Sequence, residues 1–226
     1  MSTKKNQRFA RIQELLQQMG DMALSALNKG VESFINLDQD LAAHVVAEDD
    51  KMDELDDHIE SEIVRAIARF QPVAADIRQL SVHFKVITDL RRIGRYGYDM
   101  ALLTQRMKDE RHFKKLIKIP EMAKIADRMT RMALKALFDP QAQSPLDKLI
   151  EEDELVDAMM EELFRELVTY TSEDPGRFTV AMYYLLAGRY LERAEDHAVS
   201  IGYYAHYMKT GDRGLNFGAT IKKKKK

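Results

Sequence analysis

Apolar residues recur at three- and four-residue steps through most of the chain, with polar residues between them. This repeat belongs to one face of an α-helix, and the Asn-Gly or Asp-Gly signals of β-hairpins are missing. Three of the runs consist of Leu41, Val45, Met52, Leu55, Ile59 and Ile63; of Ile77, Leu80, Phe84 and Ile87; and of Leu146, Leu149, Val156, Leu163 and Leu167. The pattern predicts an all-α protein.

Prolines and one capping residue divide this pattern into helices. The five prolines, at positions 72, 120, 140, 145 and 175, fall between helical runs, where helix ends tolerate them. Asp38 is expected to be an N-cap, after a break near Asn36. Six helices are expected, at residues 5–35, 38–69, 73–107, 119–138, 145–171 and 176–209. Helices of this length with short connections pack antiparallel, as bundles.

The chain also repeats itself. Residues 19–27 match residues 129–137 at a spacing of 110, and the acidic segment 48–53 returns as 152–157 at a spacing of 104. A third match joins 90–95 to 191–196 at a spacing of 101. Three matches in the same order indicate duplication of a three-helix unit. We expect two tandem bundles, at residues 1–109 and 110–210, followed by a frayed polar and basic tail at 211–226.

Composition and charge exclude several classes of protein. The net charge is only -2, so no nucleic-acid surface is expected, and no run of residues is apolar enough to cross a membrane. Cysteine is absent, which excludes disulfides, zinc-thiolate sites and thiol nucleophiles. No phosphate-binding glycine loop, Ser/His/Asp arrangement or Glu-x-x-His pair appears. We therefore expect a cytoplasmic protein with no catalytic residues, and not an enzyme.

Paired carboxylates are the chemical feature that stands out. Asp153 and Asp157 are four residues apart, and so are Glu192 and Asp196, so each pair shares one helix face. Such pairs are usually solvated, but these border apolar stripes, where a carboxylate is costly without a partner. If the fifth and sixth helices are neighbours, the four carboxylates converge and call for a hard cation with oxygen ligands.

The first half carries the same acidic pair but differs opposite it. Asp49 and Asp53 match Asp153 and Asp157, whereas Arg91 and Arg95 stand where the second half has Glu192 and Asp196. Two guanidinium groups at this spacing are expected to pair with the two aspartates and to take the place of a cation. The alternative is that both arginines simply reach solvent.

Several of these segments resemble PhoU proteins. Residues 70–78 (FQPVAADIR) resemble the turn into the third PhoU helix, and residues 191–198 (LERAEDHA) resemble the family's Leu-Glu-Arg-Ile-Gly-Asp-x-Ala signature. The Asp-x-x-x-Asp pairs at 153–157 and 49–53 match its acidic motif, and the resemblance spans residues 10–209. It implies a six-helix tandem bundle that binds metal clusters through these pairs. The ligands that carry over are Asp153, Asp157, Glu192 and Asp196, with Glu152 as an extra ligand.

The resemblance also implies a role. PhoU-like proteins repress phosphate uptake and phosphate-starvation signalling, working with a phosphate ABC transporter and a sensor histidine kinase. We therefore expect a homodimeric regulatory scaffold that holds a divalent or trivalent metal (Mg, Mn, Fe or Zn) and contacts the transporter's ATPase subunit and the kinase at the inner face of the membrane. The alternative is a helical adaptor of another pathway that has lost the metal, with Arg91 and Arg95 as its signs. A metalloenzyme is disfavoured, because no nucleophile or base accompanies the carboxylates.

Overall fold

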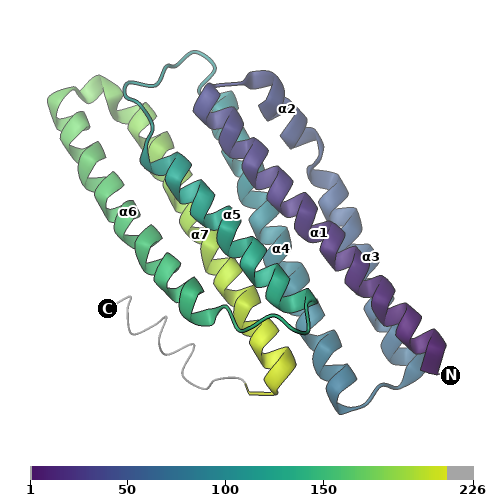
Figure 1. Cartoon of the computed structure of the whole chain (residues 1–226). Coiled ribbons are helices and arrows are strands. Elements are labelled where there is room, and N and C mark those ends of the chain that lie inside the picture. The colour runs from purple at the N-terminus through teal and green to yellow at the C-terminus, as the bar shows by residue number, and fades with distance from the viewer. Residues whose placement is uncertain (1, 213–226) are drawn as a thin grey trace.

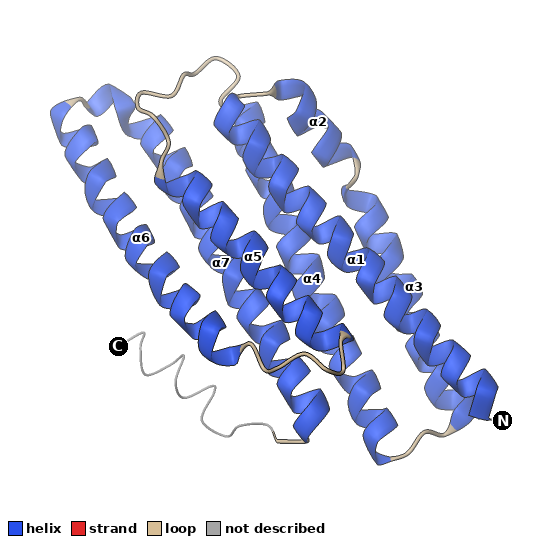
Figure 2. Ribbon diagram, in the orientation of Figure 1, coloured by secondary structure: helices blue, strands red, loops and turns tan. Residues whose placement is uncertain are grey.

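The computed structural model describes residues 2–212, and within this part of the chain it is built from helices joined by short loops, with no strand (Figures 1 and 2). The helices are α1 (Ser2–Asn36), α2 (Gln39–Ala47), α3 (Asp49–Phe70), α4 (Ala74–Arg106), α5 (Lys118–Phe138), α6 (Leu146–Glu173) and α7 (Phe178–Thr210), with a short 3-10 turn, η1 (Pro175–Arg177). The all-α prediction is confirmed. Most of the tail expected at 211–226 lies outside the described residues.

One expected helix, at 38–69, is wrong: it is two helices that meet at Glu48. Asp38 caps α2 as expected, accepting a hydrogen bond from the Leu41 amide at 2.9 Å. Val45 of α2 and Ala101 of α4 belong to a small apolar cluster separate from the main core. Both α2 and α3 pack against α1 and α4, and the helix is interrupted at Glu48, whose amide donates to the carbonyl oxygen of Val45, three residues back, at 3.2 Å. The apolar repeat continues across the break, so periodicity alone does not reveal it.

The two halves share one hydrophobic core. Within the first half α1 packs along α4, and within the second α5 packs along α7; α4 then packs on α7, and α1 on α5 (Figure 1). Residues from both halves, such as Leu27, Leu90 and Leu191, are fully buried in the same cluster. Each buried leucine contributes roughly 1.5–3 kcal/mol. The helices α3 and α6 lie on opposite flanks of this four-helix centre (Figure 1).

The α1–α4 contact depends on two glycines. A Cβ atom on Gly97 would lie 2.3 Å from the carbonyl oxygen of Ala26, and one on Gly30 would lie 2.1 Å from the carbonyl oxygen of Gly97. Real Cβ atoms do not approach backbone this closely. The two helices therefore cross at a distance that only glycine permits.

The loop between the halves is tied to both of them by His112. Its Nε2 lies 3.0 Å from the carbonyl oxygen of Phe34 and 3.1 Å from that of Ile35, at the C-terminal end of α1. Its Nδ1 lies 2.9 Å from the hydroxyl of Tyr184, a buried residue of α7. Because carbonyls only accept, Nε2 carries the proton and Nδ1 accepts from Tyr184.

None of the described helices combines the length and the apolar character that a membrane span needs.

Candidate metal centre

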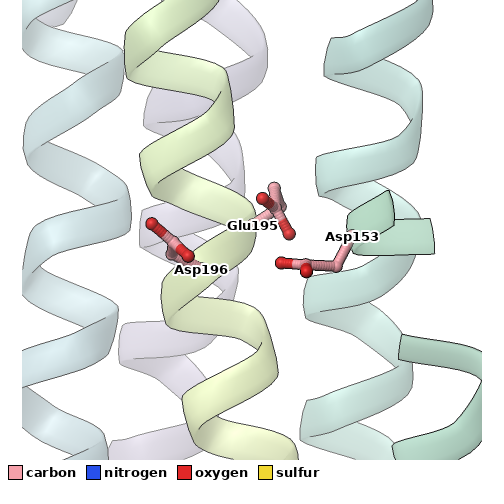
Figure 3. Close-up of side chains that lie close together, drawn as sticks. All are labelled: Asp153, Glu195 and Asp196. Carbon is pink, nitrogen blue, oxygen red and sulfur yellow. The ribbon is translucent and has the colours of Figure 1, made fainter. Parts of the chain in front are cut away.

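The contact between α6 and α7 brings acidic side chains from both helices together. One carboxylate oxygen each of Asp153, Glu195 and Asp196 lies within 4.8 Å of the other two. Asp153 comes from α6 and reaches toward α7, where Glu195 and Asp196 are neighbours in the sequence (Figure 3). Three negative groups this close repel one another unless a proton or a cation lies between them.

Glu195 is the fully buried member of this acidic cluster. Its side chain is 0% exposed, and neither of its carboxylate oxygens has a hydrogen-bond partner of normal geometry. Burial, assisted by the nearby carboxylates of Asp153, Asp196 and Asp157, raises the pKa of Glu195 to about 11. A buried group in this state must either hold a proton, which it can share with Asp153, or bind a positive ion.

Two of the predicted ligands form an outer part of the same site. Glu192 is buried, and the Nη1 atom of Arg189 donates to its two oxygens at 2.8 and 2.5 Å. Burial raises the pKa of Glu192; the charges of Asp157 and Asp196 act in the same direction, against that of Arg189. The repulsion among these carboxylates shows that Asp157 and Glu192 extend the cluster along the α6–α7 contact.

Glu152, the extra ligand implied by the resemblance, is held elsewhere. Arg128 of α5 donates to both of its oxygens, at 3.2 and 2.5 Å, and Lys148 lies 3.6 Å away. The hydrogen bond from Arg128 lowers the pKa of Glu152 below its usual value. With its negative charge already balanced, Glu152 ties α6 to α5 and is not part of the cluster.

Sequence reasoning did not select Glu195, although a signal was present. Leu191, Ala194, Ala198 and Ala205 are buried on the core side of α7. Glu195 follows Leu191 by four residues, so it falls on this apolar stripe. A charged residue at a core position marks a candidate site more strongly than an acidic pair at the rim of the stripe.

In the first half, the expected ion pairs are present. Arg91 Nε lies 2.7 Å from Asp53, and Arg95 Nη1 lies 2.7 Å from Asp49, which confirms the predicted pairing. At the spacing of 101, Gly94 occupies the position of Glu195. The first half thus lacks all three of the acidic groups that α7 contributes, and its two aspartates are neutralised by arginines.

His197 fixes α7 against the first half next to the acidic cluster. Its Nδ1 lies 2.7 Å from a carboxylate oxygen of Asp89 on α4, and its ring stacks on Tyr96 at a centroid distance of 6.0 Å. Burial raises the pKa of Asp89, which His197 partly opposes. His197 therefore lies between the two halves and holds the rotation of α7 that presents Glu195 to α6.

Comparison with known proteins gives one consistent result. A family model described as the PhoU domain matches twice, at residues 16–104 and 119–205, in agreement with the internal duplication. A PhoU homologue from Rhizobium meliloti is 30% identical over 87% of this chain and 83% of its own length, and one from Aquifex aeolicus is 31% identical over 90% and 93%. Both are named phosphate-specific transport system accessory proteins, not enzymes.

Solved structures agree. The crystal structure of PhoU from Pseudomonas aeruginosa aligns with a TM-score of 0.87 and 29% identity, over 92% of this chain and 99% of that one. A phosphate transport system regulatory protein PhoU from Streptococcus pneumoniae shares the fold, with a TM-score of 0.80 at 20% identity. The sequence motifs, the duplicated bundle and these matches lead to one conclusion: the chain belongs to the PhoU family.

Proposed function

We propose that this protein is a metal-binding negative regulator of phosphate uptake and phosphate-starvation signalling. The observation that carries the metal is Glu195, a fully buried carboxylate placed against Asp153 and Asp196, with no basic side chain paired to it among the described residues. The support for phosphate transport is the name shared by its relatives, phosphate-specific transport system accessory protein PhoU.

The donors suit a hard cation. Carboxylate oxygens are the preferred ligands of magnesium and manganese, and they also bind iron and zinc. Asp153, Glu195 and Asp196 form the inner group of candidate ligands, and Asp157 and Glu192 are further candidate ligands on its outer side. A bound cation would take the place of the proton on Glu195 and offset the mutual repulsion of the carboxylates.

The regulatory role is that of a scaffold. We infer that the protein works in the cytoplasm as a homodimer and contacts the ATPase subunit of a phosphate transporter and a sensor histidine kinase at the inner face of the membrane. The long helix faces of the bundle are surfaces of the kind that bind partner helices or loops.

Metal binding is tested by loading purified protein with Mn²⁺, removing free ion, and measuring bound metal by elemental analysis. The parent is expected to retain metal, and the double variant Asp157→Asn with Asp196→Asn is expected to lose it with unchanged helical circular dichroism. The matched control, Asp49→Asn with Asp53→Asn, changes the equivalent first-half pair and is expected to retain metal. Equal metal in the parent and the 157/196 variant would refute the assignment.

The cellular role needs its own experiment. Deleting the gene is expected to raise phosphate-starvation gene expression in phosphate-rich medium, and tagged protein is expected to co-purify with the transporter's ATPase subunit or with the kinase. If deletion leaves phosphate-starvation gene expression unchanged, and neither partner co-purifies with the tagged protein, the regulatory role is contradicted. This result would favour the second candidate, a metal-free helical adaptor. The observation in its favour is that arginines neutralise the aspartate pair of the first half.

A further inference from the structure

A groove runs along the outside of the α6–α7 contact, beside the acidic cluster. Its volume is about 810 Å³, and its walls come from α6 and α7. Apolar side chains form part of its lining: Met160, Phe164 and Leu185. Phe164 is 53% exposed, which leaves an aromatic face open to a partner.

The charged lining of this groove is balanced as the structure stands. Three arginines, Arg165, Arg189 and Arg193, line it together with three acids, Asp157, Glu161 and Glu192. Arg189 is bound to Glu192, Arg165 donates to Glu161 at 2.9 Å, and Arg193 lies 3.4 Å from Asp196 of the cluster. The arginines are therefore occupied by carboxylates of this chain, two of which belong to the candidate metal centre.

A cation in that centre changes this balance. It attracts the carboxylates of Asp157 and Glu192, and it repels the neighbouring guanidinium groups. With a divalent ion bound and the proton of Glu195 released, the net charge of the cluster and the groove together rises by about +1. Arg189 and Arg193 then have hydrogen-bond donors to offer to carboxylates from outside the chain.

We propose that this groove is a metal-dependent docking site for an acidic amphipathic helix of a partner protein, a step that rests on the metal binding proposed above. Two neighbouring helices with apolar side chains in the groove between them accept a third helix through its apolar stripe, at three- and four-residue spacing. The freed arginines select acidic residues flanking that stripe. Metal binding thereby increases the affinity of the groove for the partner helix, without any large movement of the bundle.

The test measures binding of a fluorescent 18-residue helical peptide, with leucines on one face and glutamates beside them, to the full chain by fluorescence anisotropy. Mn²⁺ binding is measured separately by calorimetry on the same samples. With Mn²⁺ the peptide is expected to bind about tenfold tighter than in EDTA, as two newly available charge pairs give. A peptide with lysines in place of the glutamates is expected to show no such gain.

Two variants and two matched controls locate the site. Arg189→Gln and Phe164→Ser are each expected to abolish the metal-dependent gain while Mn²⁺ binding is retained. Arg65→Gln removes the same kind of i,i+3 pair in the first half, where Arg65 lies 3.1 Å from Glu62, and is expected to change nothing. Phe178→Ser removes a phenylalanine that is 58% exposed outside the groove, and is also expected to change nothing.

The outcomes separate the two proposals. If no Mn²⁺ binds, the proposed metal centre is refuted, and so is the metal-dependent docking site. If Mn²⁺ binds but the peptide affinity is unchanged, or is equal for the lysine peptide, only the docking site is refuted. If Mn²⁺ instead makes the chain self-associate in sedimentation and Phe164→Ser prevents this, the groove takes a second copy of the chain and the partner helix is excluded.

Discussion

Replacing Glu195 with glutamine is the most direct probe of the acidic cluster. Without metal, the parent must hold a proton on Glu195 in the folded state, because its pKa is raised to about 11. In the unfolded chain the pKa returns to its ordinary value of 4.5, so at pH 7 the unfolded carboxyl is ionised. The folded state therefore binds more protons, and its stability falls as the pH rises above 4.5.

The magnitude follows from these two values. From the ordinary pKa of 4.5 to pH 7 is 2.5 pH units, and at about 1.36 kcal/mol per unit the protonation costs the metal-free fold about 3 kcal/mol. Glutamine has the same shape, carries no charge, and can donate from its amide to the surrounding carboxylates. We expect Glu195→Gln to be more stable than the parent by up to about 3 kcal/mol at pH 7, and by almost nothing near pH 4.5.

The assay is urea unfolding in EDTA, followed by circular dichroism between pH 5 and pH 8. Over this range the parent is expected to lose about 4 kcal/mol relative to the variant. Glu151→Gln is the control, since that exposed glutamate lies on α6, the helix that carries Asp153, and pairs with Lys148 at the surface. Added Mn²⁺ at a hundredfold excess over its Kd is expected to stabilise the parent by about 2.7 kcal/mol and to leave Glu195→Gln unchanged. A stability difference that does not vary with pH would refute the reasoning.

Three further predictions concern the rest of the bundle, each measured as the change in the free energy of unfolding. Arg91→Ala with Arg95→Ala is expected to cost about 1 kcal/mol or less, because both arginines and Asp53 are about half exposed and only Asp49 is more buried; a loss above ~3 kcal/mol would show that they act as a buried pair. Gly97→Ala is expected to cost roughly 1–3 kcal/mol, despite a gain in helix propensity, because its Cβ meets backbone of α1 at 2.3 Å; an unchanged midpoint would contradict the close crossing. His112→Ala is expected to cost about 1–3 kcal/mol, because the buried Tyr184 hydroxyl keeps its bond to the backbone of Phe113 but loses the acceptor for its own proton; an unchanged free energy of unfolding would contradict this role.

Much of the fold could be predicted because a helix is a local structure. The spacing of apolar residues and the positions of the prolines predict five of the six expected helices, and the internal repeat predicts the duplicated bundle. The pairing of Arg91 and Arg95 with Asp53 and Asp49 could also be predicted, because equivalent positions in two copies of one unit face equivalent neighbours. These inferences need only periodicity, capping and comparison of the chain with itself.

The break at Glu48 could not be predicted, because the segment keeps its apolar spacing through it. Only the structure shows the turn in which the Glu48 amide donates to Val45 and the separate placement of α2 and α3 against α1 and α4. The shared core of the two bundles could not be predicted either. The helices α4 and α7 carry ordinary helix patterns, and no local feature of the sequence indicates that they face each other.

The candidate metal centre divides in the same way. The sequence by itself determines that acidic residues recur in pairs on α6 and α7, and that the first half has arginines opposite its own pair. Only the tertiary structure decides that Arg128 balances Glu152, while Glu195 lies buried against Asp153 with no basic partner in the part of the chain that the structure describes. The physical reason is that the partner of a charged side chain is set by the rotation and register of neighbouring helices, and a shift of one residue turns a side chain by about 100°.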